Sequence, residues 1–198
     1  MVRARQGQSI GTPQAARLVA PHGRFAASFV EALAEGFCRG NRPRATPREL
    51  RQAEGDFTRF MAARLQAAQR IVPPSGERLS PVPASLHWLV VGGVFVGELS
   101  FRRRLNAWLV QSGGHIGYGI RPTWRRRGFG ARLLALGLDE ARAAGLSQVL
   151  LTCHDDNAAS AGVIEANGGI LAGVVDDVFG GGPLRRYWID LGAQPCPA

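Results

Sequence analysis

A basic turn that contains two glycines constrains the fold of this chain more than any other segment. It spans residues 125–130, reads Arg-Arg-Arg-Gly-Phe-Gly, and follows a strand-like run that Pro122 ends, because proline offers no N–H to a ladder. The run after it, residues 130–144, has helical periodicity. A turn that opens a helix points several unpaired N–H groups in one direction, and the helix dipole adds positive potential. The pattern therefore predicts a phosphate cradle and a ligand that carries a pyrophosphate.

Two helical runs precede this turn, and short strand-like runs surround it. The first expected helix covers residues 25–37, and the second starts at the capping-box sequence Thr46-Pro47-Arg48-Glu49 and ends before Pro73. After the helix at 130–144, the sequence Asp155-Asp156-Asn157 can cap a fourth helix that runs to about residue 167. The expected strands cover residues 18–20, 86–91, 94–101, 115–121, 149–153, 170–178 and 184–191, with a tight hairpin at Gly92-Gly93.

This order of elements predicts an α/β fold. The helix at 130–144 is expected to be a right-handed crossover, which makes strands 115–121 and 149–153 parallel. The other strands should pair antiparallel, giving a mixed, mostly antiparallel sheet with helices on both faces. A chain of 198 residues is long enough for one such domain.

Composition narrows the class of protein. No apolar run approaches the roughly 20 residues that span a bilayer, and the N-terminal residues lack the apolar stretch of a signal peptide. The three cysteines show neither metal-ligand spacing nor a disulfide framework, so we expect no metal and a reducing cytoplasm. The net charge of +9 comes entirely from arginine and favours anionic ligands, either a polyphosphate cofactor or a nucleic acid.

Residues 114–167 resemble the GNAT superfamily of acyl-CoA N-acyltransferases, in particular a bacterial acetyltransferase branch with two leading helices. The turn at 125–130 matches the superfamily's Gln/Arg-x-x-Gly-x-Gly/Ala pyrophosphate loop, and Asn157-Ala158-Ala159-Ser160 matches its Asn-x-x-Ala/Ser helix start. The resemblance implies a single domain over residues 18–191, with a helical acceptor-side portion at 24–72 and a sheet and acetyl-CoA-binding core at 85–191. Residues 1–17 and 192–198 are then tails.

The resemblance also implies a reaction. Acetyl-CoA would be the co-substrate, and a primary amine of a small molecule or peptide would attack its thioester directly. Two strands that part at one end would hold the pantetheine arm, and a backbone N–H near Tyr118 would hold the thioester oxygen. The cofactor-binding residues implied by the family pattern are Ile120, Arg125, Arg126, Arg127, Gly128, Phe129, Gly130, Ala131, Asn157 and Ser160. Each of the three arginine side chains could equally be a solvated surface group.

Two residues are candidates for the general base. Glu98 lies in the middle of an apolar strand, where partial burial would raise its pKa toward working pH. The alternative is a glutamate that faces outward, or one that is ion-paired, for example with Arg102 or Arg104. His115 stands at the start of the strand beside the expected thioester, and its alternative is a structural histidine bonded to backbone.

The family's general acid, a tyrosine seven residues after the asparagine, is replaced here by Ile164. Tyr118 or a water molecule would have to protonate the leaving thiolate, unless Tyr118 only packs in the sheet. Four aromatic residues could line an acceptor pocket or belong to the core: Trp88, Phe101, Trp108 and Trp124.

The acetyltransferase interpretation has two rivals. A non-catalytic acyl-CoA-binding sensor would share the fold and lack the acid. A nucleic-acid-binding module would use the arginine surplus, although the chain carries no recognisable motif for it. We therefore expect no nucleic-acid or membrane partner, and a homodimer stays open.

Overall fold

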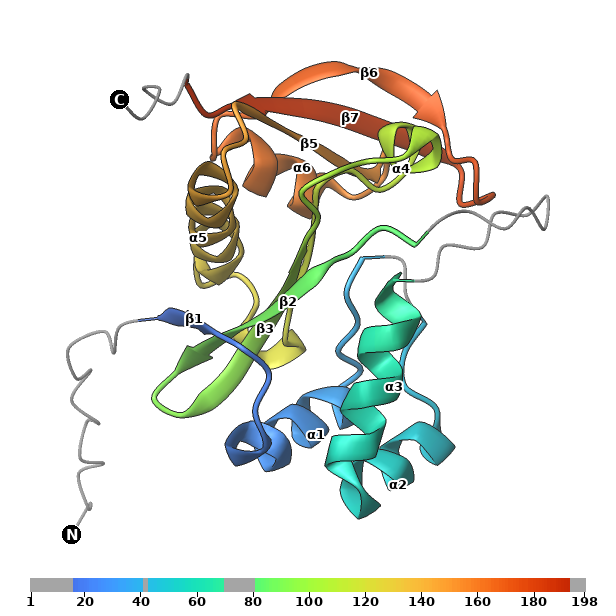
Figure 1. Ribbon diagram of the computed structural model, residues 1–198, viewed down its shortest axis with the longest axis vertical. Helices are drawn as coiled ribbons and strands as arrows, with labels where there is room; N and C mark the ends of the chain where they lie inside the picture. The colour runs from blue at the N-terminus through green and yellow to red at the C-terminus, as the bar shows by residue number, and fades with distance from the viewer. Residues whose placement is uncertain (1–15, 41–42, 70–80, 193–198) are drawn as a thin grey trace, which may run out of the picture.

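The computed structural model describes residues 16–40, 43–69 and 81–192, which form an α/β protein (Figure 1). Its described strands make two antiparallel sheets, one of four strands and one of three. The first sheet has the order β1 (Arg17–Val19), β2 (Ser85–Val91), β3 (Val94–Phe101) and β4 (Ile116–Ile120). The second has the order β5 (Gln148–His154), β7 (Pro183–Asp190) and β6 (Ile170–Asp176).

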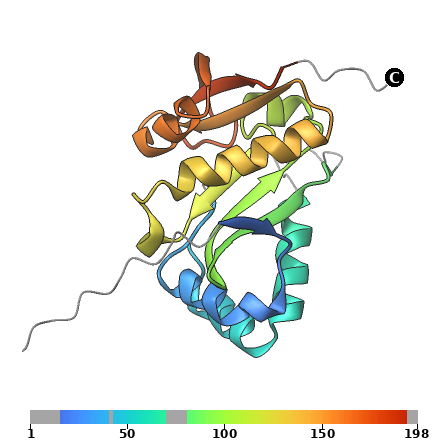
Figure 2. The same ribbon diagram turned by 90° about the vertical axis from the view of Figure 1, so that its left-hand side faces the viewer.

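Helices cover both faces of the first sheet. The helices α1 to α3 lie on one face, and α5 lies on the other between the two sheets (Figures 1 and 2). The short helix α6 packs against β5. The α-helices are α1 (Ala26–Ala34), α2 (Pro47–Gly55), α3 (Phe57–Gln69), α4 (Ala107–Gln111), α5 (Phe129–Ala143) and α6 (Ala158–Glu165), and the 3₁₀ turns are η1 (Gly23–Phe25) and η2 (Pro122–Trp124).

The expected fold class is confirmed, and several local signals behave as predicted. The Thr46 side chain accepts the Glu49 N–H while Glu49 accepts the Thr46 N–H, so the capping box is complete. The Gly92-Gly93 turn joins β2 to β3. Gly145, with φ +83°, follows α5 as its left-handed terminating residue.

The structure differs from the sequence prediction at two places in the helices. The single helix expected after Thr46 is two helices, because α2 ends at Gly55 and the Asp56 carboxylate accepts the Arg59 N–H at the start of α3. The helix α4 was not predicted. It has only five residues, and Asn106 caps it by accepting the Leu109 N–H. A single helical turn carries too little periodicity to be read from sequence.

The expected parallel ladder between β4 and β5 does not form. β4 pairs with β3 and β5 pairs with β7, and the two sheets meet at one isolated bridge, of antiparallel type, between Gly114 and Leu151. Gly114 has φ +69°, and a Cβ there would lie 2.3 Å from the Leu150 carbonyl oxygen. Only glycine therefore permits this approach, and beyond it the two strands belong to different sheets.

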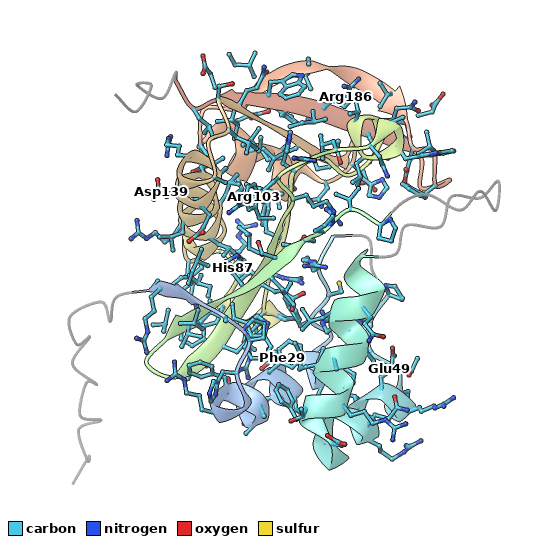
Figure 3. The ribbon with its side chains drawn as sticks, in the orientation of Figure 1. Phe29, Glu49, His87, Arg103, Asp139 and Arg186 are labelled. Carbon is cyan, nitrogen blue, oxygen red and sulfur yellow. The ribbon has the colours of Figure 1, made fainter. Side chains whose placement is uncertain are left out.

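Two apolar cores fill the spaces on either side of the first sheet. Between that sheet and α1–α3, Phe29 stacks on Trp88 at 4.6 Å and meets Phe95 edge-on at 4.9 Å. Figure 3 shows Phe29 between the helices and the strands, while Asp139 projects from the outer side of α5. The second core lies between the sheets, α5 and α6, and includes Phe101. Trp88 and Phe101 are thus core residues.

The described residues contain no helix long and apolar enough to cross a membrane. The same residues contain no group of three or more histidine, cysteine or acidic side chains placed to hold a metal ion.

Candidate functional site

The turn that is predicted to cradle a phosphate lies at the start of α5. Arg126 and Gly128 both have left-handed backbone, with φ values of +59° and +78°, and Gly128 is the N-cap residue of α5. This backbone turns the free N–H groups of the first helical turn toward solvent, where an anion can reach them. Gly128 has open space where a Cβ would stand. Gly130 also packs tightly, because a Cβ there would lie 3.1 Å from Val163 in α6.

Two of the three loop arginines are held by the protein itself. Arg125 Nε donates to the Ile120 carbonyl oxygen at 3.1 Å. The Arg127 guanidinium lies over the Trp124 ring, 5.6 Å from its centroid. All three arginines are exposed, and the fixed donors of the cradle are its backbone N–H groups.

Next to the cradle, β4 presents an open edge. The Arg121 N–H donates to the Val96 carbonyl, and the Arg102 N–H donates to the His115 carbonyl, each at 2.8 Å. In an antiparallel pair the backbone groups alternate in direction, so those of Ile116, Tyr118 and Ile120 point away from β3. The predicted Tyr118 and Ile120 backbone groups therefore face the gap between the sheets.

The Tyr118 side chain reaches the first turn of α6. Its hydroxyl lies 3.0 Å from the Ser160 hydroxyl and 3.3 Å from the Ser160 carbonyl oxygen, to which it donates. Burial raises the pKa of Tyr118 to about 12, so the phenol keeps its proton at neutral pH. Asn157 caps α6 by accepting the Ser160 N–H at 3.0 Å. Ile164, which stands at the position of the family's tyrosine, is fully buried in the core and carries no acid. Tyr118 instead places a phenol beside this turn.

Glu98 lies on the opposite face of the sheet and is completely buried. Its Oε1 accepts from Arg64 Nη2 at 3.1 Å and lies 3.5 Å from Arg39 Nη1, while its Oε2 accepts from Trp88 Nε1 at 3.1 Å. The alternative of an ion-paired glutamate therefore holds, with Arg39 and Arg64 as its partners in place of Arg102 or Arg104.

The expected pKa of Glu98 was wrong. Burial raises the pKa of this carboxyl, but the charges of Arg64 and Arg39 and the hydrogen bonds from Arg64 and Trp88 outweigh burial and lower it. Glu98 is therefore a paired anion at neutral pH and a weak proton acceptor.

His115 holds the two sheets together. Its backbone N–H donates to the Leu150 carbonyl at 2.8 Å, and its Nδ1 accepts from the Leu150 N–H at 2.9 Å. Burial lowers the pKa of the imidazole, which favours the neutral ring with its proton on Nε2. This is the geometry of the structural alternative for His115.

Sequence reasoning missed two features beside the site. The segment after α1 crosses β4 so closely that a Cβ on Gly119 would lie 2.6 Å from the Cys38 carbonyl oxygen. Arg121, at the end of β4, is buried among groups of α1. Neither contact has a local sequence signal, because the partners are more than 80 residues apart.

The two sheets part between β4 and β5, and the turn at the start of α5 lies beside the open edge of β4. A phosphate-bearing ligand can bind between these two strands. The sequence profile of the acetyltransferase (GNAT) family matches residues 49–168, which is more than half of the chain. The chain therefore belongs to the GNAT acetyltransferase family.

Solved structures share the fold at low sequence identity. The putative acetyltransferase YncA from Salmonella typhimurium, solved with acetyl-CoA, is 16% identical with a TM-score of 0.53, covering 92% of this chain and 98% of that one. Mycobacterium smegmatis RimJ, in complex with CoA-disulfide, is 17% identical with a TM-score of 0.61, covering 90% and 86%. The ribosomal-protein-S5-alanine acetyltransferase from Vibrio fischeri is 14% identical with a TM-score of 0.58, covering 87% and 91%. A search of curated proteins gives no match.

Proposed function

We propose that this protein transfers the acetyl group of acetyl-CoA to a primary amine of a small molecule or peptide. The observation that carries the proposal is the continuous run from the open edge of β4 to the cradle at Gly128. Structures of similar fold, YncA among them, were solved with acetyl-CoA, and others with CoA. Family membership supports the acetyl transfer, and the donors of this run suit a pantetheine arm that ends in a pyrophosphate.

The binding roles follow from the backbone. The N–H groups of residues 126–131 would hold the pyrophosphate, and the N–H of Ile120, whose carbonyl already accepts from Arg125, would hold a pantetheine amide. The Tyr118 N–H faces the same gap and would hold the thioester oxygen, where negative charge develops during attack. The acceptor-side helices, within the proposed portion 24–72, would shape the amine side.

Proton movement requires one acid and one base. Tyr118 supplies the acid, because its phenol is neutral and its hydroxyl is hydrogen-bonded to Ser160 in the first turn of α6. The base is water rather than a side chain: Glu98 is neutralised by arginines, and His115 Nδ1 is occupied by the Leu150 N–H. Bringing amine and thioester together then supplies most of the rate by proximity.

Among the described residues, the site contains no free carboxylate or imidazole that could act as a base. A second candidate function therefore stays open. A protein of this fold that binds an acyl-CoA as a sensor, without transfer, would show the same cradle and edge. It differs from the enzyme in releasing no thiol with any amine.

The test has two stages. Calorimetry with acetyl-CoA should show binding, and Gly128→Asp should abolish it by placing a carboxylate in the cradle. A panel of amines is then screened for release of the CoA thiol and for acetylated product. Because the chain contains no lysine, its own side chains give no background of N-acetylation. Absence of acetyl-CoA binding would overturn the proposal, and binding without thiol release across the panel would favour the sensor.

A further inference from the structure

A buried arginine at the end of β4 ties the cofactor side of the molecule to the acceptor-side helices. Arg121 is 7% exposed, and within the described part of the chain its guanidinium donates only to groups of α1 and its C-terminal end. Its Nε lies 2.9 Å from Glu35 Oε1, its Nη1 lies 3.1 Å from the Ser28 hydroxyl, and its Nη2 lies 3.1 Å from Glu31 Oε2. Such charge-assisted contacts are directional and short.

Glu35 extends this link to the turn that leads into the cradle. Its second oxygen accepts from the Thr123 hydroxyl at 2.9 Å and from the Thr123 N–H at 3.4 Å. Thr123 lies in η2, directly before the cradle residues. One carboxylate therefore holds both the residue that directly follows β4 and the entrance to the cradle.

The two acidic residues of this cluster are not equivalent. The Glu31 side chain is 66% exposed and, among the described residues, pairs with Arg121 alone, whereas the Glu35 side chain is 23% exposed and contacts both Arg121 and Thr123. The Arg121 hydrogen bond, with those from Thr123, lowers the pKa of Glu35 against the effect of burial, so the link is charged at neutral pH.

We infer that Arg121 and Glu35 are positioning residues for acetyl-CoA. They fix the distance between the edge at Ile120 and the cradle, and the position of both relative to α1. Acetyl-CoA can then contact both without a rearrangement of the loop. Preorganisation of this kind lowers the cost of binding. The inference rests on the proposed function, because it concerns the ligand of that same site.

The test compares three variants of the full chain by calorimetry with acetyl-CoA. Glu35→Gln keeps the shape and removes the charge, Thr123→Val removes only the hydroxyl donor, and Glu31→Gln is the matched control one helical turn away. We expect Glu35→Gln to raise the Kd about tenfold, since a charge-assisted link becomes neutral. Thr123→Val should raise it less, and Glu31→Gln should change it less than about twofold, as exposed pairs contribute little.

Steady-state kinetics separate positioning from mere stability. The KM for acetyl-CoA should rise in Glu35→Gln and fall back in Glu35→Asp, with kcat unchanged, at a temperature where all variants are folded. Equal Kd values in Glu35→Gln, Thr123→Val and the unaltered chain would overturn the inference while leaving the proposed function intact. No binding by the unaltered chain would overturn the proposed function and the inference with it.

Discussion

Replacing Glu98 by glutamine distinguishes a structural anion from a catalytic base. The change keeps an acceptor for Trp88 Nε1 but leaves Arg39 and Arg64 facing a neutral group in the interior. Breaking a buried ion pair by removing one partner costs about 3–5 kcal/mol. The Arg64 side chain is 17% exposed and regains some hydration, so we expect a cost near the lower limit, about 3 kcal/mol.

This cost can be measured as a fall in Tm. For a chain of 150–250 residues, 1 kcal/mol corresponds to roughly 2–4 °C, so Glu98→Gln should lower the Tm by about 6–12 °C in calorimetry or circular dichroism. Asp139→Asn is the control, because it removes the same charge from an exposed pair with Arg142 at 2.8 Å. That pair should contribute about 0–1 kcal/mol.

The pH dependence has a defined sign. The folded pKa of Glu98 lies below its ordinary value of 4.5, so its stabilising contribution is present above pH 4.5 and is lost as pH falls through the folded pKa. The Tm difference between Glu98→Gln and the unaltered chain should therefore shrink in acid.

Activity decides the role of Glu98. A general base contributes about 10²–10⁴-fold, whereas a structural anion should leave kcat/KM within about threefold at a temperature where both proteins are folded. If Glu98→Gln melts like Asp139→Asn but loses 100-fold or more in kcat/KM, roughly the least a base contributes, the reasoning fails and Glu98 is the base.

Three further outcomes are expected. Tyr118→Phe should lower kcat by about tenfold or more without changing acetyl-CoA affinity, since it removes a neutral acid; an unchanged kcat would assign that step to water. In the unaltered chain, kcat/KM should rise with pH to the pKa of the acceptor amine, about 8 for an α-amine, and should show no loss from phenol ionisation well below the Tyr118 pKa of about 12. Gly114→Ala should cost about 2–5 kcal/mol from left-handed strain and the clash with Leu150, whereas Gly93→Ala, equally left-handed but in open space, should cost only about 1–2 kcal/mol; equal melting temperatures would contradict this.

The parts of the fold that depend on short-range chemistry were predictable. The cradle, the capping box at Thr46 and the hairpin at Gly92-Gly93 each need only residues within one turn, so local sequence determines them. The parting of β4 from β5 was predictable only in outline. Its extent depends on how β7 pairs with β5 and on the tight approach at Gly114, which are contacts between distant segments.

The partners and protonation states of individual side chains were harder to predict from the sequence. Glu98 was recognised as unusual in an apolar strand, but its partner Arg64 lies 34 residues away on a helix. His115 could be a base or a structural residue until the Leu150 N–H, 35 residues away, is seen to occupy its Nδ1. In both cases burial and long-range partners, rather than residue type, set the protonation state.

The open edge of β4 has a consequence for how proteins of this fold diverge. Its donors and acceptors are main-chain groups, which every residue except proline carries in full. Substitutions along such a strand can change side chains freely without removing the groups that a ligand would contact. The structures compared above share the fold at 14–17% identity, a level at which most side chains differ. Sequence alignments compare side chains, so they do not detect a site that is built from backbone groups. Such a site is recognised from the geometry of the strand and from the few glycines that shape it.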